Sequence, residues 1–208
     1  MIFDLDDTLV HSEAVREAFA CVAAELRIDR ATLNRTLDAL PGRPAREIFD
    51  ALRVGDAGAA TEHFLARLDE LNEKLPTVAY DDADATLDAL AKRGSTLLLS
   101  TGSSPERARQ VLGQEGWETR FTVVLGSDDT CRKGDEHYRQ IAERAPDPEW
   151  TAKAITVGDS PNDMRLGAEH GVPVRIGVDR DGDPRRLLAA GATHVVESLA
   201  DILTILGG

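Results

Sequence analysis

Short apolar runs alternate with amphipathic stretches from residue 81 to the end of the sequence. The runs at 96–100, 122–125 and 154–157 are bounded by turn-forming residues, which is typical of strands buried on both faces of a sheet. Helix-start signals separate them, such as Ser104 directly before a proline. Strands in alternation with helices predict an α/β fold, with a mostly parallel sheet covered by helices on both faces.

The pattern differs between residues 12 and 80. Here the apolar residues recur at spacings of three and four, which is typical of helices with one buried stripe. The first stripe consists of Val15, Phe19, Val22 and Leu26. The Pro-Gly-Arg-Pro segment at 41–44 interrupts the pattern, and helical spacing resumes after it. We therefore expect an all-helical unit to be inserted into the α/β fold.

Composition and charge narrow the classes of partner. The 208 residues carry a formal net charge of −13, which disfavours binding to nucleic acid or to an anionic membrane surface. We find no apolar stretch of the roughly 18 residues that a membrane span needs, and no leader-like start. With Cys21 and Cys131 as the only cysteines, a reducing cytoplasm is the expected location. A monomer or a homodimer is the expected state.

Polar residues gather where the expected strands end. The carboxyl ends of parallel strands share one edge of a sheet, and ligands bind there. Several carboxylates at one point favour a hard cation such as Mg²⁺, while a lysine and a hydroxyl beside them suit phosphoryl oxygens. The residues at these ends are Asp4, Asp6, Asp7, Thr101, Lys133, Asp159 and Asp163.

These residues carry a family resemblance. The segment D-L-D-D-T-L at 4–9 resembles motif I of the haloacid dehalogenase superfamily, whose pattern is D-x-D-x-[TV]-L. The remaining motifs follow in order: Thr101 at a strand end, Lys133, and G-D-S-x-x-D at 158–163. The ending at 191–199 is also similar to that family. The resemblance implies a Rossmann-like catalytic core formed by 1–11 and 81–208, with residues 12–80 as a helical cap.

The resemblance also implies catalytic and metal-binding roles for the carboxylates. Asp4 is expected to be the nucleophile that forms an aspartyl-phosphate, and Asp6 the general acid and base. Asp4, the backbone carbonyl of Asp6 and Asp159 are expected to ligate Mg²⁺. Asp163 is expected to bind the metal through water or to hold Lys133. Strand alternation predicts that Asp4 and Asp6 point the same way.

The phosphoryl oxygens are expected to be bound by Thr101, the Gly102 amide and Lys133. Ser100 competes with Thr101 for this role, and we prefer Thr101 because Gly102 then falls in the loop. Arg43, in the break between helices of the insert, is a minor candidate for substrate contact.

Two positions depart from the family pattern. Asp7 stands where the family often has glycine, and we interpret it as peripheral to the chemistry. His11 stands where an aspartate often precedes the accessory domain, and its role is left open.

The position of the insert and Asp6 favour one reaction. An insert between the first two motifs resembles the caps of phosphoglycolate phosphatases, β-phosphoglucomutases and haloacid dehalogenases. The dehalogenases usually lack an acid at the position of Asp6, and Lys74 is a weak candidate for the cap lysine of a phosphonatase. We therefore expect a Mg²⁺-dependent phosphatase acting on a small phosphorylated metabolite. A phosphomutase and a catalytically silent binding protein remain as alternatives.

Overall fold

The computed structural model describes residues 1–40, 45–72, 74–75, 77–128, 130–145, 147, 149–180 and 182–207. The chain forms two compact units, one made of Met1–His11 with Ala79–Gly208 and the other of Ser12–Val78. Each unit is described by itself below.

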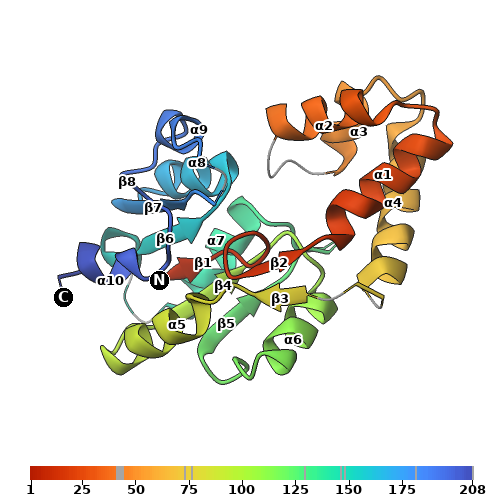
Figure 1. Ribbon diagram of the computed structural model, residues 1–208. Coiled ribbons are helices and arrows are strands. Elements are labelled where there is room, and N and C mark those ends of the chain that lie inside the picture. Colours follow the sequence, from red (N-terminus) through yellow and green to blue (C-terminus); the bar gives the residue numbers. More distant parts are fainter. Residues whose placement is uncertain are drawn as a thin grey trace. The chain divides into compact units, whose positions relative to one another are not determined.

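The first unit is built on a six-stranded sheet in the order β5-β4-β1-β6-β7-β8 (Figure 1). Every neighbouring pair in it is parallel. Its strands are β1 (Ile2–Phe3), β4 (Leu97–Ser100), β5 (Phe121–Leu125), β6 (Ile155–Gly158), β7 (Val174–Val178) and β8 (His194–Val196). The predicted α/β class with a mostly parallel sheet is confirmed.

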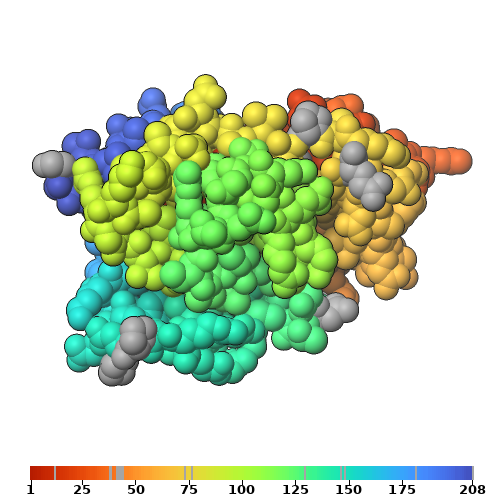
Figure 2. Space-filling view, turned by 90° about the horizontal axis from the view of Figure 1, so that it is seen from below, coloured from red at the N-terminus to blue at the C-terminus, as the bar shows by residue number. Residues whose placement is uncertain are grey.

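Helices cover both faces of this sheet. They are α5 (Ala83–Lys92), α6 (Pro105–Gln114), α7 (Asp135–Arg144), the 3-10 helix η1 (Trp150–Lys153), α8 (Pro161–Glu169), α9 (Arg185–Ala189) and α10 (Asp201–Ile205). Seen toward the β5 edge, the yellow-green and green segments of α5 and α6 lie on one side and the turquoise segment of α7 on the other (Figure 2). No helix among the described residues is both long and apolar enough to cross a bilayer.

The alternation of side chains along β1 divides the core into two layers. Phe3 belongs to the apolar cluster that contains Leu87 of α5 and Val111 of α6. Its neighbour Ile2 belongs to a second cluster with Tyr138 and Ile141 of α7. Because successive side chains of a strand point to opposite faces, each residue of β1 fixes one layer of helices.

Strand β1 is the place where the strand order reverses. The chain passes from β1 to β4 and β5 on one side, and then returns to β6, β7 and β8 on the other. Ile2 pairs with both Leu98 and Thr156, so β1 has a neighbour on each side. In parallel sheets such a reversal leaves a crevice at the carboxyl ends of the strands, where ligands bind. Asp4 directly follows β1 and therefore lies at this point.

The second unit contains four helices among its described residues: α1 (Ala14–Glu25), α2 (Arg30–Ala39), α3 (Ala45–Ala51) and α4 (Ala57–Asn72). Its core is a cluster of three phenylalanines, Phe19, Phe49 and Phe64, with ring centroids 4.2–6.3 Å apart. Leu26 ends the apolar stripe that the spacing predicts for the first helix, but it is 42% exposed and follows the last helical residue of α1.

Two short strands depart from the all-helical prediction for residues 12–80. Strand β2 (Val10–Ser12) and strand β3 (Thr77–Ala79) form a two-stranded sheet where the chain enters and leaves the insert. Thr77 and Val78 are β-branched, and this residue type favours extended backbone. A strand of three residues is shorter than one helical turn, so the spacing of apolar residues cannot distinguish it from the end of a helix.

A buried histidine links two strand ends in the first unit. His137 of α7 is fully buried, with Nδ1 lying 2.8 Å from the Ser100 hydroxyl and Nε2 lying 3.3 Å from the carbonyl oxygen of Gly126. A carbonyl only accepts, so we assign the ring proton to Nε2, and Nδ1 then accepts from Ser100. Burial lowers the pKa of His137 to about 4, so the ring is neutral near pH 7.

Because His137 is buried in its neutral form, we expect the protein to lose folding stability in mild acid. The ordinary pKa of histidine is 6.5. Between that value and about pH 4 the unfolded chain therefore takes up a proton that the folded chain excludes, and folding is progressively disfavoured. Over this window we expect the free energy of unfolding to fall by about 3 kcal/mol more in the wild type than in His137→Gln. Urea unfolding at a series of pH values measures the difference.

The matched control is His194→Gln, which removes an exposed imidazole of the same unit. We expect its pH curve to run parallel to the wild type, because carboxylates elsewhere titrate alike in both proteins. A parallel curve for His137→Gln would contradict the assignment of a buried neutral ring.

Candidate active site

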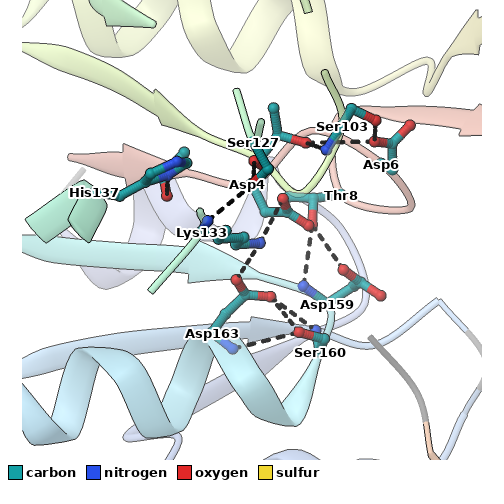
Figure 3. Close-up of polar contacts among 12 residues, drawn as sticks. Asp4, Asp6, Thr8, Ser103, Ser127, Lys133, His137, Asp159, Ser160 and Asp163 are labelled. Carbon is teal, nitrogen blue, oxygen red and sulfur yellow. Dashed lines mark hydrogen bonds and ion pairs between the residues drawn. The ribbon is translucent and has the colours of Figure 1, made fainter. Parts of the chain in front are cut away.

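Asp4 is held at the end of β1 by its backbone and by a lysine. Its backbone N–H donates to the carbonyl oxygen of Val157 in β6 over 2.9 Å, which continues the sheet by one residue. Its buried carboxylate accepts a hydrogen bond from Lys133 Nζ over 2.7 Å. Lys133 lies equally close, at 2.7 Å, to Asp163 (Figure 3). One ammonium group therefore bridges two buried carboxylates from different parts of the chain.

Asp163 is fixed by the start of helix α8. Ser160 is the N-cap residue, and its hydroxyl accepts from the backbone N–H of Asp163. The Asp163 carboxylate accepts in return from the N–H and the hydroxyl of Ser160, at 3.2 and 2.6 Å, which completes a capping box. Gly158 leaves room for this side chain, because a Cβ there would lie 2.4 Å from Cγ of Asp163. The other Asp163 oxygen remains for Lys133.

Thr8 holds the third carboxylate of the group, Asp159. The Thr8 hydroxyl is fully buried, accepts from the backbone N–H of Asp159 over 3.0 Å and donates to its carboxylate over 3.2 Å. Thr8 lies on the loop that follows β1, and Asp159 directly follows β6. This pair therefore ties the two neighbouring strand ends together beside Asp4 (Figure 3).

The electrostatics of the group favour a cation. Asp4, Asp159 and Asp163 each offer a carboxylate oxygen, and these oxygens lie within 4.8 Å of one another. Burial raises the pKa of Asp4 to about 7 despite the attraction of Lys133. Burial, followed by repulsion from Asp4, also raises the pKa of Asp159 well above its usual value. Burial alone would lower the pKa of Lys133, but Asp163 and Asp4 together raise it.

Lys133 thus pairs with the buried carboxylates of Asp4 and Asp163, while the partly buried Asp159 adds a third negative charge, so excess negative charge remains. A divalent cation with oxygen ligands matches this donor set in charge and in chemical type. The residues therefore fit a Mg²⁺ ion.

Asp6 lies apart from this group. Its carboxylate accepts from Arg107 Nη2 over 2.7 Å, from the Ser103 hydroxyl over 2.6 Å and from the Thr101 hydroxyl over 3.4 Å. The expectation that strand alternation turns Asp4 and Asp6 the same way does not describe these contacts, because β1 ends at Phe3. The carboxylates of Asp4 and Asp6 have different partners, although the charge of Asp6 also contributes to the raised pKa of Asp4.

The expected phosphate-binding residues lie on two connected loops. The hydroxyl of Thr101 accepts from the Ser103 N–H over 3.0 Å and faces Asp6, whereas Ser100 is engaged with His137. Ser127 joins the two loops, because its hydroxyl donates to the Thr101 carbonyl and accepts from the Lys133 N–H. Phosphate binding by Thr101 in preference to Ser100 stays a prediction.

Asp7 and His11 form a separate pair on the exposed side of the first loop. Asp7 is exposed, adopts a left-handed backbone conformation with φ of 58° and lies 3.3 Å from His11 Nδ1. Arg43 lies outside the described residues.

Sequence reasoning missed several residues that hold the site. Thr8 stands in the quoted motif, but its contact with Asp159 spans 151 positions and leaves no local signal. Ser127 and His137 act through contacts that only the folded chain brings together. Arg107 also carries no local signal in the sequence, because its partner Asp6 lies 101 positions away.

The comparisons with known proteins agree with this arrangement. The profile of the haloacid dehalogenase-like hydrolase family matches residues 1–176. The chain belongs to this family.

Individual relatives resemble the chain over most of its length. It is 32% identical over 209 residues to an uncharacterized protein of Lacticaseibacillus casei, with 96% of this chain and 95% of the relative covered. It is 31% identical over 196 residues to a phosphoglycolate phosphatase of Rhodospirillum rubrum, with 84% and 77% covered. A haloacid dehalogenase-like hydrolase structure from Streptococcus pneumoniae superimposes with a TM-score of 0.81 at 19% identity, covering 99% and 96% of the two chains. The last likeness concerns the fold alone.

The tight approach of Gly158 to Asp163 yields a stability prediction. In Gly158→Ala the new methyl group must displace the Asp163 side chain, which weakens both the capping box and the contact with Lys133. We expect the free energy of unfolding to fall by about 1–3 kcal/mol, the usual cost of overpacking a filled site. Urea unfolding at pH 7 measures the loss.

Gly55→Ala is the control, because no atom lies within 4 Å of the position its Cβ would take. We expect it to keep the stability of the wild type. Equal stability of Gly158→Ala and wild type would show that Asp163 does not fill this space.

Proposed function

We propose that the protein is a Mg²⁺-dependent phosphatase that hydrolyses a small phosphomonoester through an aspartyl-phosphate on Asp4. The observation that carries this proposal is the placement of Asp4. It is buried at the reversal of strand order, in contact with Lys133 and within ligand distance of two further carboxylates. A carboxylate nucleophile, a cation site and a phosphate-binding ammonium group are the parts that such a reaction needs.

The metal-binding role falls to the residues nearest Asp4. We assign the ligands to Asp4, the backbone carbonyl of Asp6 and Asp159, while Asp163 binds through water or holds Lys133. When bound, Mg²⁺ supplies positive charge that offsets the repulsion among the carboxylates and the phosphoryl group.

The chemical steps follow from the two aspartates on the first loop. A carboxylate oxygen of Asp4 attacks phosphorus, the bond from phosphorus to the leaving oxygen breaks, and Asp6 gives its proton to that oxygen. Asp6 then takes a proton from a water molecule that attacks the aspartyl-phosphate, which releases phosphate and restores Asp4. Thr101, the Gly102 N–H and Lys133 bind the phosphoryl oxygens and stabilise the charge that develops on them.

The inserted unit is proposed to act as a cap that excludes bulk water during the reaction. Substrate contact by Arg43 stays a prediction. The relative named phosphoglycolate phosphatase supports a small phosphorylated metabolite as the substrate class. The expected cytoplasmic location, the lack of nucleic-acid and membrane partners, and the monomeric or dimeric state also stay predictions.

The test is phosphate release from para-nitrophenyl phosphate and from a panel of small phosphomonoesters. We expect activity with Mg²⁺, none after treatment with EDTA, and recovery when Mg²⁺ is returned. Asp4→Asn removes the nucleophile, and we expect it to lower kcat by at least about 1000-fold. A wild-type protein that stays inert over the whole panel with Mg²⁺ present would overturn the proposal.

Asp7→Asn is the matched control, because it makes the same change of charge on the same loop. Asn tolerates the left-handed backbone conformation that Asp7 adopts, so the turn is kept. We expect its activity to stay within about threefold of the wild type, as for an exposed residue outside the chemistry.

The phosphomutase alternative is separated by its product. Incubation with a hexose 1-phosphate and a trace of the bisphosphate yields free phosphate from a phosphatase and an isomeric hexose phosphate from a mutase. Accumulation of the isomer would replace hydrolysis as the assigned reaction.

A further inference from the structure

A buried arginine on helix α6 makes close contact with Asp6. Arg107 Nη2 donates to Asp6 Oδ1 over 2.7 Å, and its side chain is only 9% exposed. Arg107 Nε donates to the Ser103 hydroxyl over 3.2 Å, and that hydroxyl donates to Asp6 Oδ2 over 2.6 Å. Both carboxylate oxygens of Asp6 are therefore held, one directly and the other through Ser103 (Figure 3 shows the Ser103 contact).

The position of Arg107 is unfavourable for helix α6 itself. Ser104 caps the helix, and its hydroxyl accepts from the backbone N–H of Arg107, which places this cation in the first turn. The helix dipole disfavours positive charge at this end, and burying a guanidinium group costs further free energy. Such local conflicts are expected where a residue serves a site. Its contacts with Asp6 and Ser103 offset these costs.

The geometry also relates this contact to the phosphate-binding loop. The Thr101 hydroxyl lies 3.4 Å from the same Asp6 oxygen that accepts from Ser103. A phosphoryl group bound by Thr101 would thus lie close to the Asp6 carboxyl group. The planar fork of arginine fixes the direction of its two N–H groups, so it restricts the rotation of a carboxyl group better than a lysine does.

We propose that Arg107 is a positioning residue that orients the Asp6 carboxyl group toward the leaving oxygen. This inference rests on the proposed function, because it assigns Arg107 a part in the proton transfer from Asp6. Without Arg107 the Asp6 side chain turns among several rotamers, and fewer of them reach the leaving oxygen. The effect must therefore depend on how much the leaving group needs a proton.

The test compares two substrates that differ in this need. The leaving group of para-nitrophenyl phosphate departs readily as an anion, whereas that of phenyl phosphate is more basic and needs the proton. For Arg107→Gln we expect kcat/KM for phenyl phosphate to fall by roughly 10- to 100-fold. For para-nitrophenyl phosphate we expect a fall of less than about threefold, because the transition state there gains little from the proton.

A second readout uses Asp6→Asn, which removes the proton donor. If Arg107 acts through Asp6, Arg107→Gln has no further effect on phenyl phosphate hydrolysis in the Asp6→Asn background. Arg109→Gln is the matched control. Arg109 lies on the same helix, is 70% exposed and pairs with Glu106, so we expect wild-type kinetics on both substrates.

The outcomes separate the two proposals. An equal fall on both substrates, or a full further loss in the Asp6→Asn background, would overturn the role of Arg107 while leaving the phosphatase in place. A wild-type protein inert on both substrates with Mg²⁺ would instead overturn the proposed function. If circular dichroism shows that Arg107→Gln is unfolded, Ser103→Ala carries the same test, since it removes the second contact that holds Asp6. We expect it to change the substrate ratio in the same direction, and an unchanged ratio would count against the inference.

Discussion

The ammonium group of Lys133, shared between Asp4 and Asp163, is the interaction on which the arrangement of the site depends. Buried carboxylates repel one another and lose their hydration, so they stay charged only where a cation compensates them. Lys133 reaches both at 2.7 Å. Removing one partner of such a buried group typically costs about 3–5 kcal/mol, because the remaining charges stay buried without compensation. The fold must therefore bring Lys133, Asp4 and Asp163 into contact.

The parallel sheet brings these residues together because each lies on a loop at the same edge. Asp4 follows β1, and Asp159 and Asp163 follow the adjacent strand β6. Lys133 comes from the loop between β5 and α7, and Ser127 joins this loop to the one after β4. Since all these strands run in the same direction, every loop leaves from the same edge. Gly158 then leaves room for the Asp163 side chain, whose carboxylate reaches Lys133.

The sequence predicts those parts of the fold and of the site that depend on local patterns of residues. Apolar runs and helix-start residues predict the α/β fold, which the six-stranded parallel sheet confirms. The strand-end rule selects Asp4, Lys133, Asp159 and Asp163, which the structure brings together. Contacts such as those of Thr8 with Asp159 and of Arg107 with Asp6 depend on the folded chain, so no spacing rule finds them. The short strand β3 was missed because three residues carry too little periodicity.

The hydrogen bond from the Tyr80 N–H to the Leu9 carbonyl, at 3.0 Å, has a consequence for how the chain is assembled. It joins the residues of the first unit that stand just before and just after the insert, so the ends of the interruption are already closed within that unit. The entropy cost of closing a loop grows only with the logarithm of its length. The inserted unit can therefore lengthen, shorten or be exchanged with little penalty to the sheet. Changes of length within the insert are therefore expected to leave the carboxylate group at the edge of the sheet in place.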